Sequence, residues 1–221
     1  MKKMFFILNF HGFGKPSRDI PLEEEPFWVE IPFFEAVLDL IQSREDVQIT
    51  CDDSNASDYE IALPALKARN MAAKIFVLVQ HIGQKGYLSL RQIAELIAGG
   101  LTLGSHGMRH CPWTDLNDQA LHQELVEAKD RLEQIAGRPV TDAACPFGKY
   151  DRRVLRAVQN SGYDKLYTSD DLPAFADSWV LSRYTILRTH DLAQVGEIIN
   201  GAPRGLAGAW PRVKSKWKQL R

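Results

Sequence analysis

The sequence predicts an α/β fold built on parallel strands, in a single domain spanning residues 1–221. Short apolar runs alternate with amphipathic segments along most of the chain, which is typical of consecutive βαβ units. A length of 221 residues suits one substantial domain and is short for two. The chain has no internal repeat, low-complexity segment or linker that would divide it.

About seven strands, with helices between them, account for this pattern. We expect strands over residues 4–10, 47–51, 73–79, 101–105, 140–144, 165–168 and 181–187. We expect helices over residues 32–43, 61–69, 90–98, 152–160 and 193–200, and over the segment between Asn117 and Gly137.

The helix after Asn117 has the clearest local signals. Asn117 is a suitable N-cap, and Gly137 is a suitable terminator. Apolar residues between them recur at intervals of four and three, at Leu121, Leu125, Ala128, Leu132 and Ile135. The helix over residues 152–160 has similar boundaries, with Asp151 before it and Gly162 after it.

Two polar clusters follow the ends of predicted strands. Asp52 and Asp53 follow one strand, and His106 and His110 follow another about fifty residues later. One carboxylate and two imidazoles form a three-ligand set for a catalytic divalent metal, with positions left open for water and substrate. The second carboxylate would lie beside the metal, where a general base for that water is needed. An Asp-Asp pair alone is more often a pair of solvated loop residues or a helix cap. Two histidines four apart are also unspecific, although on a helical turn they would face the same way.

Three motifs in order and at suitable spacing give the chain a resemblance to a known family. They are Thr50-Cys51-Asp52-Asp53-Ser54, then His106-Gly107-Met108-Arg109-His110, then Ala144-Cys145-Pro146-Phe147-Gly148. From about residue 50 to 167 the chain resembles the polysaccharide deacetylases, also called the NodB homology or carbohydrate esterase 4 family. The resemblance implies a distorted (β/α)7 barrel, which agrees with the strand count.

The resemblance also implies roles for individual residues. Asp52 corresponds to the catalytic base of the family. Asp53, His106 and His110 correspond to its metal ligands. Pro146 and Phe147 correspond to a loop that walls the substrate groove, and the implied oxyanion donor is the backbone N–H of Phe147.

Several positions depart from the family pattern. Cys51 and Ser54 replace the usual Phe and Gly, and Gly107 removes a hydroxyl that normally follows the first histidine. Cys145 stands near the place where an Arg is common, so the motif places no Arg to orient the base. The late Leu-x-His motif, the family's source of a general acid, is not clearly present.

The proton donor is therefore open between two histidines. His11 follows the first predicted strand. It would therefore lie at the C-terminal end of the barrel strands, where barrel enzymes have their active sites. His190 lies between the last strand and the last helix, where a surface histidine near a helix N-terminus is the simpler interpretation. We name His11 as the candidate. Trp113 follows His110 closely and either packs in the core or forms a wall on which a sugar stacks.

The composition is that of an ordinary soluble globular protein, with 45% hydrophobic and 25% charged residues and a net charge of -1. Nothing in it points to nucleic acid. The three cysteines are an odd number without a C-x-x-C element, so we expect neither a disulfide framework nor a cysteine metal site, and a reducing compartment fits. The apolar run near the start is short and interrupted by Asn9 and His11, and no run reaches the length of a membrane span. These features favour a cytoplasmic enzyme.

The stretch from residue 202 onward is basic, with six Lys or Arg and no acidic residue. A solvated tail is the default interpretation. Because Trp210 and Trp217 are interleaved with the basic residues, contact with an anionic surface is the alternative.

The sequence therefore predicts a metal-dependent hydrolase that removes an N-acetyl group from an N-acetylated sugar or polysaccharide precursor. Zinc suits the Asp-His-His set, and cobalt, nickel or manganese are the alternatives. Two other functions stay open. The same site could hydrolyse another amide, such as a formyl group or a cyclic imide. The chain could also be a catalytically lapsed module that binds glycans or acts as a scaffold.

Overall fold

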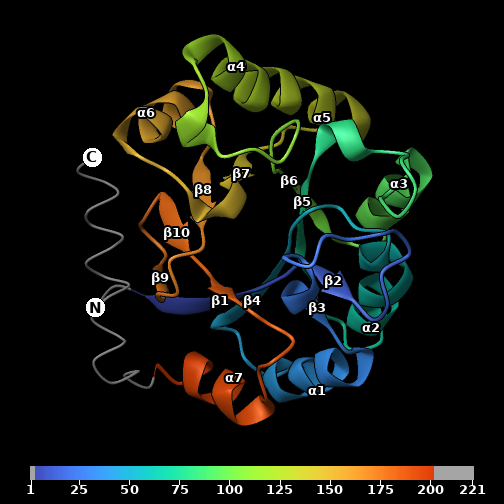
Figure 1. Ribbon diagram of the computed structural model, residues 1–221. Helices are drawn as coiled ribbons and strands as arrows, with labels where there is room; N and C mark the ends of the chain where they lie inside the picture. Colours follow the sequence, from blue (N-terminus) through green and yellow to red (C-terminus); the bar gives the residue numbers. More distant parts are fainter. Residues whose placement is uncertain (1–2, 202–221) are drawn as a thin grey trace.

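A computed structural model describes residues 3–201 of the chain. Eight parallel-paired strands form a nearly closed barrel, in the order β10-β8-β7-β6-β5-β4-β1-β11 (Figure 1). Their bounds are β1 Met4–Phe10, β4 Val47–Cys51, β5 Lys74–Val77, β6 Thr102–Ser105, β7 Asp142–Ala144, β8 Lys165–Thr168, β10 Val180–Ser182 and β11 Tyr184–Thr185. The expected (β/α)7-type barrel is confirmed.

The barrel closes through one kinked segment near the end of the described chain. Strands β10 and β11 are separated by a single residue, Arg183. Strand β10 pairs with β8, whereas β11 pairs with β1. Together β10 and β11 therefore connect β8 to β1 and close the barrel. Counted as one kinked strand, they bring the total to seven. The expectation of one continuous strand over residues 181–187 is therefore wrong, because the segment changes partner at Arg183.

Three short strands lie off this path. Strand β9, Ala174–Phe175, pairs with β1 in the antiparallel direction. Strands β2, Gly12–Phe13, and β3, Trp28–Val29, pair with each other. Strands β2 and β3 lie at the two ends of the long segment that connects β1 to α1.

The helices surround the barrel (Figure 1). Their bounds are α1 Ile31–Ile41, α2 Leu63–Lys67, α3 Leu90–Ala98, α4 Asp118–His122, α5 Ala128–Ala136, α6 Arg152–Asn160 and α7 Leu192–Ile199. A π-helical turn, Gln123–Glu127, joins α4 to α5, and a second one, Asp58–Ala62, precedes α2. The expected caps are confirmed, since the side chains of Asn117 and Asp151 accept hydrogen bonds from the first turns of α4 and α6.

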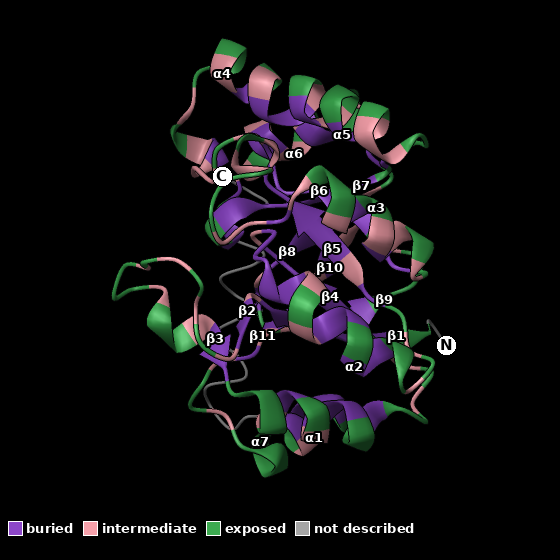
Figure 2. Ribbon diagram, turned by 90° about the vertical axis from the view of Figure 1, so that its right-hand side faces the viewer, coloured by how far each residue is buried: buried purple, intermediate pink, exposed green. Residues whose placement is uncertain are grey.

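The core has an inner and an outer layer (Figure 2). The barrel interior is filled by Phe5, Ile7, Phe76, Ala144, Tyr167, Ala174 and Leu181. The larger outer layer lies between the strands and the helices, and the helices expose their outer faces (Figure 2). Because side chains of a strand alternate between two sides, strands such as β1 and β5 contribute to both layers.

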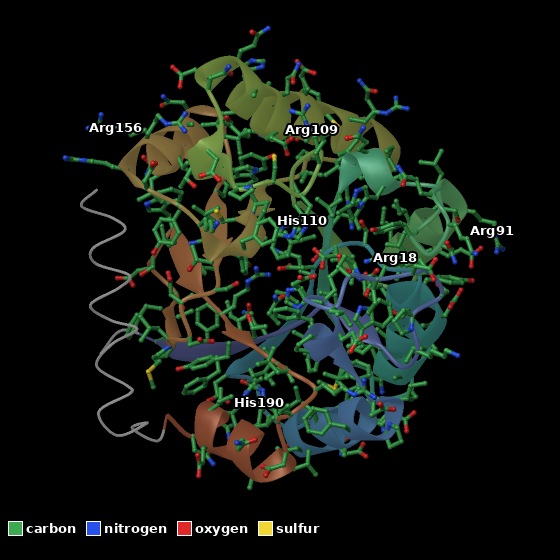
Figure 3. All side chains as sticks on the ribbon, in the orientation of Figure 1. Arg18, Arg91, Arg109, His110, Arg156 and His190 are labelled. Carbon is green, nitrogen blue, oxygen red and sulfur yellow. The ribbon has the colours of Figure 1, made fainter. Side chains whose placement is uncertain are left out.

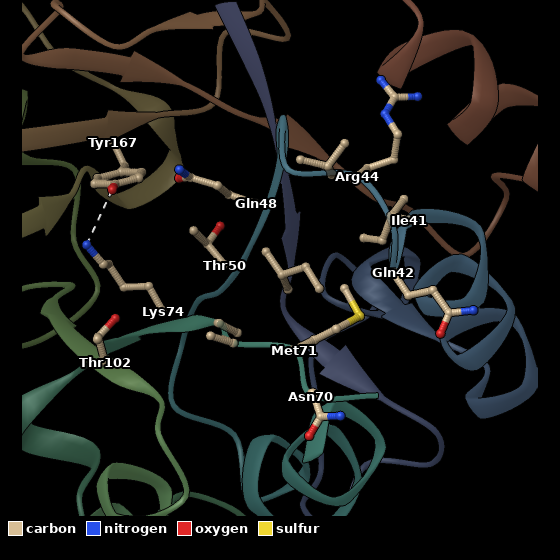
Figure 4. Close-up of a pocket in the computed structure, with 14 residues that line it drawn as sticks. Ile41, Gln42, Arg44, Gln48, Thr50, Asn70, Met71, Lys74, Thr102 and Tyr167 are labelled. Carbon is tan, nitrogen blue, oxygen red and sulfur yellow. Dashed lines mark hydrogen bonds between the residues drawn. The ribbon is translucent and has the colours of Figure 1, made fainter. Parts of the chain in front are cut away.

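The N-terminal end of the barrel contains a cavity of about 390 Å³ (Figure 4). Gln48, Thr50, Lys74, Thr102 and Tyr167 line it where their strands begin or run inward. The Lys74 ammonium pairs with the carboxylate of Asp142 and lies 3.4 Å from the Tyr167 hydroxyl. Burial lowers the pKa of Lys74 to about 8.

No helix in residues 3–201 is long and apolar enough to cross a membrane. The basic stretch from residue 202 onward, for which we expect a solvated tail or an anionic-surface contact, lies outside the described residues.

Candidate active site

The predicted site residues meet at the C-terminal end of the barrel. Asp52 and Asp53 follow β4, His106 follows β6, and His11 follows β1. They line one cavity of about 510 Å³, together with His110 and Phe147. Parallel strands carry their C-terminal ends to the same edge, which brings together residues far apart in the sequence.

Asp53, His106 and His110 form the candidate metal centre. Their ligand atoms all lie within 4.8 Å of one another. The Nε2 atoms of His106 and His110 each lie 3.4 Å from Oδ1 of Asp53. A tetrahedral ion with ligand bonds of about 2.0–2.1 Å would separate its ligand atoms by roughly 3.3 Å. The three residues therefore fit a small divalent cation.

The hydrogen bonding around these atoms supports the same fit. Nδ1 of His106 lies 2.9 Å from the carbonyl oxygen of Ala144, so in the neutral ring Nδ1–H is the donor and Nε2 keeps its lone pair. That lone pair faces Asp53 Oδ1, a buried oxygen without a hydrogen-bond partner. A cation between the two atoms, or a proton on Nε2, would relieve this contact. Although burial lowers the pKa of His106, Asp52 and then Asp53 raise it above the usual value, so these residues favour a positive charge here.

The second histidine reaches the site through a loop and not through a helical turn. His106 ends β6, and His110 has a left-handed backbone with φ of 53°. The two rings are 5.2 Å apart. The residues between them form an irregular loop, so the loop and not a helical turn brings the two rings together. Burial lowers the pKa of His110 to about 4, which keeps its imidazole neutral and available as a ligand near pH 7.

Asp52 is held by a buried network. The Arg183 guanidinium donates to both of its carboxylate oxygens, at 2.7 and 2.8 Å, and the Asn9 amide donates to Oδ2 at 3.0 Å. The Thr50 hydroxyl in turn donates to Asn9 Oδ1 at 2.6 Å. The expectation that no Arg orients the base is therefore wrong, because Arg183 does so from the barrel-closing segment.

This network also sets the charge of Asp52. Burial would raise the pKa of the Asp52 carboxyl, but Arg183 and then His106 outweigh it, so the pKa lies below its usual range. Around Asp53, burial likewise raises the pKa, and the neighbouring histidines, His106 first, hold it far below the usual range. Both carboxylates are ionised at neutral pH, as a base and a metal ligand require.

The third motif forms the rim of the cavity. Pro146 is buried, whereas 57% of the Phe147 side chain is exposed. Phe147 has a left-handed backbone with φ of 57°, an uncommon state for a non-glycine residue. Its ring stacks on that of His110, with centroids 4.3 Å apart. This turn therefore places the Phe147 ring against His110, one of the candidate metal ligands.

His11 also lines the cavity. Its ring is 4.9 Å from that of Phe27, and its buried Nδ1 has no hydrogen-bond partner. Burial lowers the pKa of His11, while Asp53 and Asp52 oppose the shift. The structure thus places this histidine beside both carboxylates.

The sequence model of the polysaccharide deacetylase family matches residues 41–166, more than half of the chain. The chain belongs to the polysaccharide deacetylase family.

Similar proteins agree with this assignment. YxkH of Bacillus subtilis (strain 168), a protein named for the same family, is 28% identical over 144 residues, which are 65% of this chain and 52% of YxkH. The chain thus spans about half the length of that curated relative. Among solved structures, the deacetylase PplD of Streptococcus pyogenes in complex with acetate has a TM-score of 0.80 at 20% identity, covering 90% of this chain and 99% of PplD. A polysaccharide deacetylase of Bacillus cereus has the same TM-score and identity, covering 90% and 69%. The two structures show the shared fold.

Two sequence candidates lie outside the cavity of this deacetylase-family barrel. Trp113 is fully buried among Leu121, Leu125 and Val154, so a sugar cannot stack on it, and the wall interpretation is wrong. His190 lies beside α7, away from His110 (Figure 3), and its Nδ1 accepts a hydrogen bond from the Leu187 N–H at 3.0 Å. It is not among the residues that line the cavity.

Sequence reasoning missed two residues of the site, Asn9 and Arg183. Each is a polar residue inside an otherwise apolar strand pattern, and both are completely buried. Because a buried charge needs a partner, an Arg in a core strand predicts a buried carboxylate nearby. That signal was available in the sequence, but it does not identify the partner.

Proposed function

We propose that this chain hydrolyses the N-acetyl group of an N-acetylated sugar or polysaccharide precursor, in a metal-dependent reaction. The observation that carries the proposal is the juxtaposition of an Asp-His-His ligand set with a separate, tethered carboxylate. Asp52 is not one of the three candidate ligands, yet it is buried and ionised beside them. A binding module has no need of such a base.

The ligands of the cation would be Asp53, His106 and His110. Zn²⁺ suits this set, and Co²⁺, Ni²⁺ or Mn²⁺ have similar preferences. When bound, the ion would supply Lewis-acid polarisation of the attacking water and of the acetyl carbonyl.

The protein's own groups would move the protons. Asp52 would accept a proton from the attacking water, while Arg183 and Asn9 keep its oxygens in place. The backbone N–H of Phe147 would donate to the oxyanion, a contact worth about 3–4 kcal/mol when it is preorganised. His11 would deliver a proton to the leaving amine.

One of the two arguments for a catalytically lapsed module, which would only bind glycans or act as a scaffold, no longer holds. That alternative rested on a missing arginine and a missing late histidine, and Arg183 supplies the first of these functions from another strand. Hydrolysis of a different amide stays an alternative, which a panel of formylated and cyclic imide substrates would separate by its products.

Acetate release from N-acetylglucosamine oligomers, measured with and without added Zn²⁺, tests the activity. Asp52→Asn should keep its metal and lose activity by about 10²-fold or more if the base is essential. His110→Ala should lose most of its bound metal. Near-normal turnover in Asp52→Asn would remove that residue from the mechanism. One metal per chain in both His106→Ala and His110→Ala would contradict the ligand assignment.

A further inference from the structure

The loop between the two candidate histidine ligands is held in an unusual way. Residues 107–109 connect His106 to His110 without regular secondary structure. The carbonyl oxygens of Gly107 and Met108 accept hydrogen bonds from the N–H groups of Val79 and Gln80, at 3.1 and 3.0 Å. The carbonyl side of the loop is thus fixed by the segment that follows β5.

On the N–H side of this loop, the N–H of Gly107 donates to Oγ of Ser105 at 3.2 Å, and the next two N–H groups donate to one side chain, Glu124. Its Oε2 accepts from the N–H groups of Met108, at 2.6 Å, and Arg109, at 3.2 Å. Its Oε1 accepts from Nε of Arg109 at 3.0 Å. This carboxylate thus serves two consecutive backbone donors of the loop.

Glu124 is fully buried, although it belongs to a helix that faces solvent on its other side. It lies in the π-helical turn Gln123–Glu127, a type of turn that often occurs at functional sites. Figure 3 shows Arg109, which partly compensates its charge, between His110 and the α5 layer. An ionic group in this position is unfavourable unless its hydrogen bonds are made, which ties Glu124 to the loop.

The identity of residue 107 follows from the same contact. A Cβ added to Gly107 would lie 2.5 Å from Oε2 of Glu124, and φ at this position is +86°. Both conditions favour glycine. The carboxylate of Glu124 therefore lies where a side chain with a hydroxyl would begin at this position.

We propose that Glu124 is a positioning residue for the metal centre. By holding residues 108 and 109, it sets the turn that directs His110 toward Asp53 and His106. This inference rests on the proposed metal-dependent function and adds a residue 14 positions beyond the second histidine. It predicts that the carboxylate controls metal affinity without touching the metal.

The test is the Zn²⁺ affinity of Glu124→Gln, measured by competition with a chromophoric chelator. The glutamine amide keeps only one acceptor oxygen, so its NH2 group must face either the backbone N–H groups of residues 108 and 109 or Nε of Arg109, and one set of hydrogen bonds is lost. We therefore expect affinity to fall by about tenfold or more, within the range seen for groups that orient metal ligands. The absorption spectrum of the Co²⁺-loaded protein should also change, since the arrangement of ligands changes. Glu127→Gln is the matched control, because Glu127 is exposed on the same turn and should keep affinity within about twofold.

A folded Glu124→Gln protein with wild-type affinity and spectrum would overturn the proposal. If this variant does not fold, Glu124→Asp, which keeps the charge but has a shorter reach, decides by the same criterion. If neither variant folds, Glu124 stabilises the helix layer as a whole, and the positioning role is wrong. A wild-type chain that binds no Zn²⁺ would instead refute the metal site itself, which is a separate result.

Discussion

At the C-terminal end of the barrel the buried ion pair is Arg183 with Asp52, and at the N-terminal end it is Lys74 with Asp142. One partner of each pair lines a cavity, Asp52 at the C-terminal end and Lys74 at the N-terminal end. At the N-terminal end the polar groups satisfy one another, with Tyr167 as an additional neighbour (Figure 4). At the C-terminal end the pair has neighbours, His11 and Asp53, that hold unpaired atoms.

The difference extends to the whole described chain. Within residues 3–201, the buried side-chain atoms that lack a hydrogen-bond partner belong to His11, Asp53, Asp58, His81 and Trp113. Each of these residues lies between a strand and the helix that follows it. No such atom lies in the segments that lead from a helix to the next strand. Unpaired polar atoms are unfavourable for stability. Because they all follow strands, the end of the barrel that holds the candidate site is the less optimised end for stability.

Arg183→Met should produce the largest combined effect. It leaves the Asp52 carboxylate buried without its cation, so we expect the free energy of unfolding to fall by about 3–5 kcal/mol. Turnover should fall by about 10²-fold or more, because the base loses its orientation and its lowered pKa. Urea unfolding and acetate release measure the two effects.

A double variant separates the charge from the packing in this result. Adding Asp52→Asn to Arg183→Met removes the uncompensated charge, so part of the lost stability should return while activity stays low. If the double variant is no more stable than Arg183→Met, burial of the charge is not the cause.

His11→Ala should slow acetate release without removing the metal, because His11 is proposed to protonate the leaving amine and is not a ligand. A loss of about 10²-fold in kcat is expected for a missing general acid. His190→Ala is the matched control and should change kcat by less than about twofold, since His190 lies outside the cavity. Were His190→Ala the damaging change, the proton donor would have been assigned to the wrong histidine.

Lys74→Met combined with Asp142→Asn should produce the smallest effect. Replacing both partners of a buried pair is often neutral, so the free energy of unfolding should change by less than about 2 kcal/mol. Activity should stay within about twofold, because the pair lies at the opposite end from the reacting groups. A large loss of activity would show that the two ends of the barrel are coupled, and that the ion pair at the N-terminal end also serves the reaction.

Local signals explain which parts of the fold could be predicted from the sequence. Helices α3 and α6 lie where expected, because each has a polar N-cap and a glycine after its end. The aspartates and histidines were also predictable, since their motifs are contiguous. The kink in the last strand was not, because it depends on a change of partner from β8 to β1 that no neighbouring residue encodes.

The ion pair between Arg183 and Asp52 could not be predicted from the sequence either. Arg183 and Asp52 are 131 residues apart, and the bond between them exists only after the barrel has closed. Likewise, Glu124 looks like an ordinary helical glutamate until the loop beside it is placed. Both residues act through tertiary contacts, and periodicity and spacing carry no information about those partners.

The order of residues along the chain fixes when the parts of the site become available during synthesis. The ribosome produces every candidate metal ligand by residue 110, but Arg183 only much later. A nascent chain, or one cut between these points, therefore contains all the candidate ligands without the cationic partner of Asp52. Completion of the last strand then supplies that partner, and barrel closure joins it to Asp52.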